Sequence, residues 1–281
     1  MPRPDPYRGR FAPSPTGPLH FGSLAAAAGS WLDARAHGGE WLLRMEDLDT
    51  PRIVPGAADD ILRTLEALGL TWDGPVVYQS ARHDAYRAAL DALKQRQQAY
   101  ACACSRKEIA DSGVAGIEGF VYPGTCRDGL PAGRVARAWR LDTRGSGVIG
   151  FDDAIQGRVG HDVEHAIGDF VLYRADGHFA YQLAVVVDDA EQGITDVVRG
   201  ADLIESTPRQ LWLQRVLGLP APRYAHLPVA VNAAGEKLSK QTLAPAIDAA
   251  SGGRALAAAL RFLGHAPPPE LASAAPAELL A

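Results

Sequence analysis

The stretch that decides the fold is Arg10-Phe11-Ala12-Pro13-Ser14-Pro15-Thr16-Gly17-Pro18-Leu19-His20-Phe21-Gly22-Ser23. Residues 8–12 can extend as a strand, whereas the three prolines and the glycine after them forbid regular structure and stiffen a loop. From Ser23 onward an alanine-rich run predicts a helix over residues 24–36, and Gly38-Gly39 ends it. The stretch therefore predicts a strand, a tight loop and a helix in close succession.

His20 and Gly22 would lie at the N-terminus of that helix. Free backbone N–H groups and the helix dipole favour an anion there. An imidazole can donate a hydrogen bond to a phosphate, and a glycine lets a nucleotide approach the backbone closely. The pair is thus a candidate phosphate site, although a His-x-Gly sequence that opens a helix is more often structural.

Length and composition describe an ordinary globular chain. Its 281 residues are 47% hydrophobic and 22% charged, which suits one large α/β domain with an insertion or two small domains. No apolar run approaches the ~20 residues of a membrane helix, and the N-terminus has no apolar signal region. We expect a cytoplasmic monomer without membrane contact.

The net charge of −5 argues against a protein that coats nucleic acid through bulk charge. A local basic track stays possible, because arginines cluster after the cysteine region and recur further on. These are Arg134, Arg137, Arg140, Arg144, Arg209 and Arg215. Solvated surface arginines are the alternative interpretation.

Strand and helix patterns alternate along most of the chain. The periodicity predicts helices over 56–69, 81–98, 206–217 and 255–263. It predicts strands over 40–45, 135–143, 148–154, 157–161, 170–174, 179–189 and 197–203. The 40–45 segment is apolar almost throughout, as expected for a parallel strand buried on both faces.

Three acidic residues follow that buried strand: Glu46, Asp47 and Asp49. Ligands of open α/β sheets bind at the carboxyl ends of strands, so these carboxylates could bind an ammonium group or order arginines. We expect a functional role for Glu46 and structural roles for the two aspartates.

The chain has three cysteines, Cys102, Cys104 and Cys126, in one glycine-rich segment. Two thiolates two residues apart suit one soft metal, and strain disfavours a disulfide between them. Zinc requires a fourth ligand, and Asp128, Glu118 or a water could supply it. Three unrelated buried thiols are the alternative.

Several ordered motifs resemble class I aminoacyl-tRNA synthetases. His20-Phe21-Gly22-Ser23 resembles their HIGH signature, and Lys237-Leu238-Ser239-Lys240-Gln241 resembles their KMSKS loop. The residues before His20 are similar to the glutamyl branch of that class, as are residues 43–52, 68–73 and 78–82. The resemblance runs from about residue 8 to about residue 245.

This resemblance implies an α/β fold with a Rossmann-like parallel sheet. Its catalytic domain would comprise residues 1–100 and 151–225, interrupted by a zinc-bearing insertion over 101–150. Residues 226–281 would hold the KMSKS-like loop and a short helical region. Related synthetases bind one structural zinc through a Cys-x-Cys pair and a Tyr-x-x-x-Cys pair, which implies Cys102, Cys104, Tyr122 and Cys126 here.

The resemblance also implies roles for the site residues. His20, Gly22, Lys237 and Lys240 would be catalytic, and His20, Gly22, Ser23 and Lys240 would bind ATP with Mg²⁺. Glutamate would contact Arg10, Ala12, Ser14, Glu46, Tyr181 and Arg199. The charge count is consistent, since two arginines match two carboxylates and Glu46 matches the ammonium. Asp169, Asp188 and Asp189 also match the second half of the glutamyl-type site.

Residues 241–281 alone follow the Lys-Leu-Ser-Lys loop, so we expect no anticodon-binding domain. This resembles truncated members of the glutamyl branch. They activate L-glutamate with ATP without needing tRNA and transfer it to the queuosine base of tRNA(Asp). Glutamylation of a tRNA 3′ end, another nucleotidyltransferase reaction and a non-catalytic RNA-binding paralogue remain the alternatives.

Overall fold

A computed structural model describes residues 6–112, 115–117, 119–231, 247, 252–271 and 274–280. Its contacts group the chain into two compact units. The first comprises Met1–Ser80, Ile194–Asp202 and Pro222–Ala281, and the second comprises Ala81–Gly193 and Leu203–Ala221. The four segments expected from the sequence remain a prediction, because contacts define compactness and not function.

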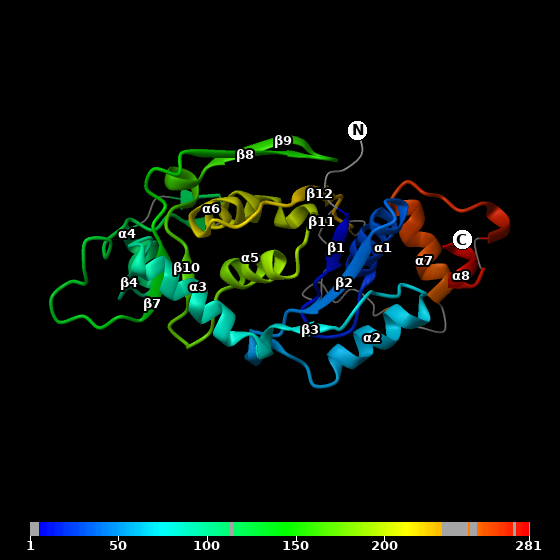
Figure 1. Ribbon diagram of the computed structural model, residues 1–281, viewed down its shortest axis with the longest axis horizontal. Coiled ribbons are helices and arrows are strands. Elements are labelled where there is room, and N and C mark those ends of the chain that lie inside the picture. Colours follow the sequence, from blue (N-terminus) through cyan, green and yellow to red (C-terminus); the bar gives the residue numbers. More distant parts are fainter. Residues whose placement is uncertain are drawn as a thin grey trace. The chain divides into compact units, whose positions relative to one another are not determined.

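The first unit is built on parallel strands (Figure 1). Strands β1 (Arg8–Phe11), β2 (Glu40–Met45) and β3 (Val77–Tyr78) pair in that order, all parallel. Strands β11 (Asp196–Gly200) and β12 (Arg223–Leu227) form a second parallel pair. β11 lies beside β1, where the Thr195 N–H donates to the Arg8 carbonyl over 2.9 Å.

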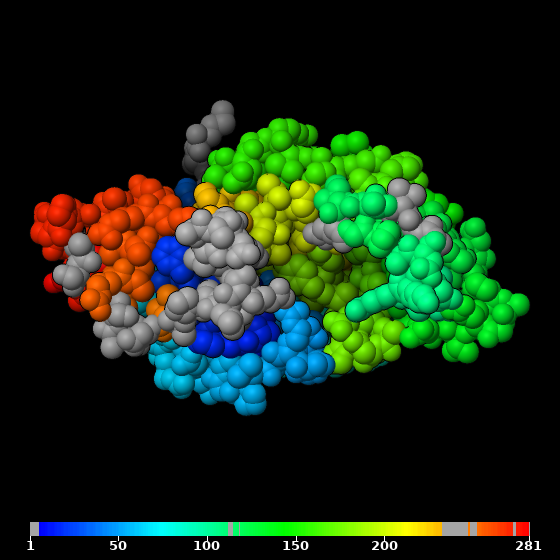
Figure 2. Space-filling model, turned by 180° about the vertical axis from the view of Figure 1, so that it is seen from behind, coloured from blue at the N-terminus to red at the C-terminus, as the bar shows by residue number. Residues whose placement is uncertain are grey.

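Helices α1 (Phe21–Ala36), α2 (Ala57–Ala67), α7 (Gly252–Phe262) and α8 (Pro276–Leu279) complete the first unit. α1 packs against β1, β11 and α7, and Figure 2 shows α7 in orange beside the blue N-terminal segments. Gly29 permits the close approach of α1 to β12, because a Cβ there would lie 2.7 Å from a methyl group of Leu227. The core includes Leu24, Trp41, Leu43, Met45, Ile61, Leu65 and Leu256.

Three helices form the middle of the second unit: α3 (His83–Gln95), α5 (Tyr181–Glu191) and α6 (Thr207–Leu217). Strands β4 (Ala99–Cys102), β7 (Ala138–Leu141) and β10 (Val171–Tyr173) form an antiparallel sheet in the order β10-β7-β4. Strands β8 (Val148–Asp153) and β9 (Gly157–Asp162) form a hairpin, followed by a π-helix over Val163–Ile167.

The expected strand over 179–189 is wrong, because this segment is helix α5. A continuous apolar run does not distinguish a buried strand from a buried helix, and residues 182–189 are all buried. Asp188 faces α3, where the Arg82 Nε donates to it over 2.6 Å and the Tyr86 hydroxyl over 2.8 Å. Tertiary burial on all sides therefore overrides the β propensity of the valines.

The cysteine segment is also more regular than expected. It contains helix α4 (Arg106–Ser112) and the short strands β5 (Ala115–Gly116) and β6 (Gly119–Phe120), which pair antiparallel. The other predicted elements are confirmed with shifted ends, and the α/β class with a parallel sheet is confirmed. Within the described ranges, every helix is too short or too polar to cross a membrane.

Candidate active site

The loop between β1 and α1 is fixed by backbone hydrogen bonds to the segment after β2. The Glu46 N–H donates to the Pro13 carbonyl over 2.9 Å, and the Val54 N–H donates to the Pro15 carbonyl over 3.0 Å. A proline has no backbone N–H to donate, so it takes part in these hydrogen bonds through its carbonyl oxygen. The end of β2 is thereby held against the signature loop.

His20 caps the N-terminus of α1. Its Nδ1 accepts the Ser23 N–H over 3.3 Å, and the Ser23 hydroxyl oxygen accepts the His20 N–H over 2.8 Å. Because Nδ1 is an acceptor, the neutral imidazole carries its proton on Nε2. The ring can therefore cap the helix and still donate to a phosphate, while Gly22 lies in the first turn.

Arg10 and Arg199 lie on adjacent strands, β1 and β11, and both are about 95% buried. The Arg199 Nε donates to the Nε2 of His226 over 3.1 Å, and its guanidinium lies 5.5 Å from the Tyr224 ring centre. His226 is fully buried and must be neutral there, with its proton on Nδ1. Sequence reasoning missed His226, which the structure places on β12.

Glu46 follows β2 and is held by an arginine from inside that strand. The Arg44 Nη2 lies 3.4 Å from the Glu46 Oε1, and the Arg44 side chain is fully buried. A guanidinium at this distance favours the ionised carboxylate. Arg44 was also missed, although a charged residue inside an apolar buried strand was a usable signal.

The remaining predicted residues divide between the two units. Ala12, Ser14 and Ser23 lie in the first unit, on the loop and on α1, whereas Tyr181 begins α5 in the second unit. Asp47 accepts the Ser80 N–H over 2.8 Å and the Ser80 hydroxyl over 2.6 Å, which is a structural contact. Lys237 and Lys240 lie outside the described residues.

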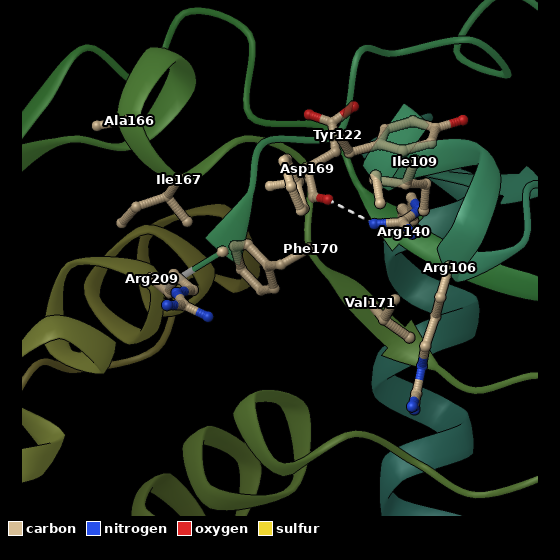
Figure 3. A pocket seen from close by; sticks show the side chains of 13 residues that line it. Arg106, Ile109, Tyr122, Arg140, Ala166, Ile167, Asp169, Phe170, Val171 and Arg209 are labelled. Atoms are coloured by element: carbon tan, nitrogen blue, oxygen red, sulfur yellow. Dashed lines mark hydrogen bonds between the residues drawn. The ribbon is translucent and has the colours of Figure 1, made fainter. Parts of the chain in front are cut away.

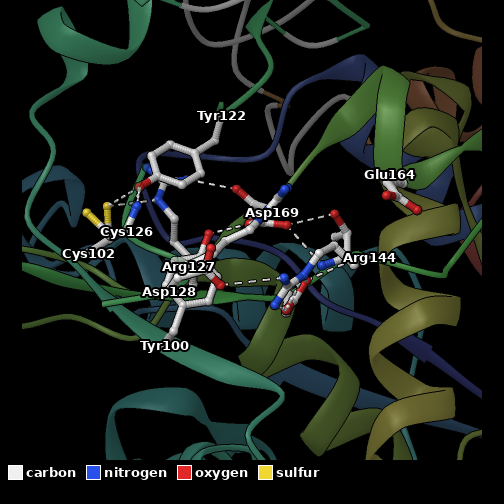
Figure 4. A network of polar contacts seen from close by, with 12 residues as sticks. Tyr100, Cys102, Tyr122, Cys126, Arg127, Asp128, Arg144, Glu164 and Asp169 are labelled. Carbon is white, nitrogen blue, oxygen red and sulfur yellow. Dashed lines mark hydrogen bonds and ion pairs between the residues drawn. The ribbon is translucent and has the colours of Figure 1, made fainter. Parts of the chain in front are cut away.

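The second unit gathers the three cysteines around the Tyr122 hydroxyl (Figure 4). The three sulfur atoms lie within 4.8 Å of one another. The Tyr122 oxygen is 3.3 Å from the Cys102 Sγ and 3.5 Å from the Cys104 Sγ, and the Cys104 and Cys126 sulfurs are 3.7 Å apart. The four residues that the resemblance implies as metal ligands therefore lie close together in the structure.

The three pair distances of 3.3, 3.5 and 3.7 Å are close to the edges of a tetrahedral metal site. Bonds of about 2.3 Å to sulfur and about 2.0 Å to oxygen give edges of about 3.8 Å between sulfurs and about 3.5 Å between sulfur and oxygen. Burial raises the pKa of the Tyr122 phenol, so its proton leaves only beside a cation. Asp128 is exposed, pairs with Arg144 and is not part of this cluster. Glu118 lies outside the described residues.

A buried polar network lies next to the cysteine cluster. Asp169 accepts from the Thr143 N–H over 2.9 Å and from its hydroxyl over 2.8 Å, and it also binds Tyr100 and Arg127. Burial and the hydrogen bond to Asp169 raise the pKa of the Tyr100 phenol. Neighbours within the second unit thus donate hydrogen bonds to the carboxylates of Asp169 and Asp188, which is typical of residues with a structural role.

Known proteins share this architecture. The family model described as tRNA synthetases class I (E and Q), catalytic domain, matches residues 7–119 and 127–255. A glutamyl-Q tRNA(Asp) synthetase from Dechloromonas aromatica is 67% identical over 98% of this chain and 92% of its own length. One from Chromobacterium violaceum is 65% identical over 95% of this chain and 89% of its own length.

A solved structure agrees with these sequence relatives. The glutamate tRNA ligase from Elizabethkingia meningosepticum, in complex with its amino acid, is 31% identical with a TM-score of 0.74. The match covers 84% of this chain and 52% of that one, so the chain spans about half the length of this ligase. The chain belongs to the class I tRNA synthetases of the E and Q type, whose catalytic domain it contains.

Proposed function

We propose that the protein activates L-glutamate with ATP, without needing tRNA, and transfers it to the queuosine base of tRNA(Asp). The family supports ATP-dependent ligation to tRNA, and the names of the curated relatives support the queuosine base as acceptor. The reaction would take place in the cytoplasm, where charged tRNA is made.

The observation that carries the glutamate assignment is the pair of buried arginines on adjacent strands. Arg10 and Arg199 would each bind one carboxylate, and Glu46, held by Arg44, would bind the ammonium. Ala12 and Ser14 on the loop would add contacts, and Tyr181 remains a further candidate from the sequence. A substrate with two carboxylates and one ammonium complements this set of charges, whereas a neutral amino acid offers one carboxylate fewer.

In the first step, an oxygen of the α-carboxylate attacks the α-phosphorus of ATP in line, and pyrophosphate leaves. The N-terminus of α1, the Nε2–H of His20 and the backbone at Gly22 would stabilise the negative charge on the phosphates. Lys237 and Lys240 would add positive charge from their loop, and ATP would bring Mg²⁺. Ser23 would keep the His20 ring in place.

In the second step, a cyclopentenediol hydroxyl of queuosine attacks the acyl carbon of the adenylate. The bond to the phosphate oxygen breaks, AMP leaves, and the hydroxyl proton passes to the AMP phosphate. The protein's part is to position the two reactants.

Zinc is the metal that the cysteine cluster fits best, with Cys102, Cys104, Cys126 and Tyr122 as ligands. The tetrahedral edge lengths and the three soft sulfur donors support this choice. A closed set of four protein ligands leaves no open position, so zinc would be structural and would join β4 to the segment over 122–126.

Amino-acid-dependent exchange of labelled pyrophosphate into ATP tests the first step. We expect exchange with L-glutamate in the absence of tRNA, and none with L-glutamine or L-aspartate. Equal exchange with glutamine would contradict the assignment of two arginines to two carboxylates. A tRNA that lacks its 3′-terminal nucleotide tests the alternative acceptor, because only 3′-end transfer needs that nucleotide. Periodate oxidation does not separate the two acceptors, since it cleaves both the terminal ribose diol and the queuosine diol.

A further inference from the structure

Arg140, on β7, belongs to the arginines that could form a basic track by their place in the sequence. The structure buries it instead, and its exposed fraction is 8%. Its Nη1 donates to the Asp169 carbonyl oxygen over 2.8 Å, and Figure 3 shows this bond beside the Tyr122 ring. Within the described part of the chain, its guanidinium forms no ion pair, and the Asp169 carboxylate pairs with Arg127 instead. Burying an unbalanced charge is unfavourable, so a counter-charge is expected close by.

The guanidinium of Arg140 contacts two of the four residues in the cysteine cluster. Its Nε donates to the Cys102 Sγ over 3.3 Å. Its central carbon lies 4.0 Å from the centre of the Tyr122 ring, which is the geometry of a cation–π contact. Arginine has only donors, so the Cys102 sulfur is the acceptor of this hydrogen bond. The buried cation is therefore directed at two candidate metal ligands.

The cluster would supply the counter-charge once it holds a metal. Three thiolates and one phenolate bring four negative charges, of which a divalent ion cancels two. Such a buried excess of negative charge is unfavourable unless a positive charge lies close to it. Arg140 lies where it can balance part of this excess, and a metal-bound thiolate is a good acceptor for its N–H group.

Two further arginines near the cluster already have carboxylate partners. Arg127 pairs with Asp169, and the Arg134 Nη1 lies 2.8 Å from a carboxylate oxygen of Glu108. Their charges are balanced whether or not a metal is bound. The charge of Arg140 is the one that the cluster itself would balance, among the arginines whose contacts are described here.

We propose that Arg140 is a positioning residue for the zinc cluster. Its Nε–H holds the Cys102 sulfur, its plane supports the Tyr122 ring, and its charge balances part of the negative charge of the ligands. The inference rests on the proposed zinc site and goes beyond it, because Arg140 is not itself a ligand. Partners outside the coordination sphere orient metal ligands and tune metal affinity. Through Arg140, zinc would hold β7 in place as well as β4.

Zinc affinity of the full chain, measured by competition with a chromogenic chelator, tests this. Arg140→Met keeps the length of the side chain but not its charge, and we expect it to weaken zinc binding about 10- to 100-fold. Arg140→Lys keeps the charge and should recover part of that loss. Equal losses in the two variants would overturn the proposal, since charge would then play no part.

Arg137→Met is the matched control, because it removes one arginine from the same segment. The Arg137 N–H donates to the Cys102 carbonyl over 2.9 Å, which a side-chain substitution leaves in place, and Arg137 itself is exposed. We expect this variant to bind zinc like the unmodified protein. A loss equal to that of Arg140→Met would overturn the proposal, because the effect would then come from overall charge.

Cobalt(II) in place of zinc separates a positioning role from a purely structural one. Without the N–H bond the Cys102 sulfur is a stronger electron donor, so the sulfur-to-cobalt charge-transfer absorption should move to lower energy in Arg140→Met. Loss of the bond to the Asp169 carbonyl alone would lower the unfolding midpoint without moving this absorption. An unmoved absorption in Arg140→Met would therefore overturn the proposal.

Arg140→Lys keeps the test valid if Arg140→Met fails to fold. A single ammonium cannot hold the sulfur and stack on the Tyr122 ring together, so we expect both the zinc affinity and the cobalt absorption to differ from those of the unmodified protein. If neither differs, the proposal is overturned.

The zinc affinity of the unmodified protein separates this inference from the proposed zinc site. Tight binding by the unmodified protein and equally tight binding by Arg140→Met would contradict this inference alone. An unmodified protein without affinity for zinc would contradict the proposed zinc site, and this inference with it.

Discussion

The Arg199 Nε donates to the Nε2 of His226 over 3.1 Å, so a fully buried imidazole from β12 holds a guanidinium on β11. The two residues stand opposite each other in the parallel register of these strands. A neutral histidine fixes the arginine without cancelling its charge, as recognition of a substrate carboxylate by this arginine would require.

His226→Phe should therefore weaken glutamate binding. Without the acceptor the guanidinium loses its orientation, and we expect the KM for glutamate in pyrophosphate exchange to rise about tenfold. The KM for ATP should stay unchanged. His226→Gln keeps an acceptor and should recover much of the loss; equal defects in both variants would argue against a positioning role.

His20 combines two roles that one substitution can separate. Asparagine is a good N-cap residue, so His20→Asn should keep the stability of α1, whereas His20→Ala should lose about 1 kcal/mol. Both variants lack the Nε2 donor, and exchange should fall at least about 100-fold in each. Thermal unfolding and exchange measured on the same samples check this, and near-normal exchange in His20→Asn would remove the imidazole from the mechanism.

Local backbone patterns and family motifs predicted part of this site. The positions of glycine and proline predicted the ends of the loop and of α1 to within a few residues, because these residues restrict the backbone locally. The four residues of the cysteine cluster followed from their spacing and the family pattern, and the fold brings them together.

Sequence reasoning missed the residues that act through a neighbour. Arg44 and His226 support Glu46 and Arg199 through contacts that exist only once the strands pair. Helix α5 was misassigned for a similar reason, since its valines are buried on every side and give no periodic signal. Tertiary packing, which local patterns do not encode, decided both cases.

Tyr122→Phe tests the fourth metal ligand. Loss of the oxygen should lower zinc affinity by about 10- to 100-fold in competition with a chromogenic chelator, and zinc removal should lower the midpoint of thermal unfolding. Tyr173→Phe is the control, because Tyr173 lies on β10 in the same unit and outside the cluster. Identical zinc affinities for the two variants would assign the fourth position to another ligand.

Asp73 gives the first unit a pH-dependent contact. Burial opposes its ionisation, but the Trp41 N–H at 2.8 Å and the Arg35 guanidinium at 2.7 Å hold the pKa of Asp73 below its ordinary value. A folded-state pKa below the unfolded value stabilises the protein above the unfolded pKa, and this stability is lost as the pH falls through the folded pKa.

Asp73→Asn should therefore lower the unfolding midpoint at pH 7 by about 2 °C, a modest shift because the side chain is partly exposed. The difference should disappear toward low pH. Asp152→Asn, which removes a mostly exposed carboxylate, is the control and should change little. A difference that persists unchanged at low pH would mean that charge on Asp73 plays no part.

The central claim is transfer of glutamate to queuosine, and incorporation of labelled glutamate into two pools of tRNA(Asp), one containing queuosine and one lacking it, tests it most directly. With ATP present, the account predicts incorporation into the queuosine-containing pool alone, in a form that survives removal of the 3′-terminal nucleotide. Equal incorporation into both pools would contradict the claim and would make the 3′ end the acceptor.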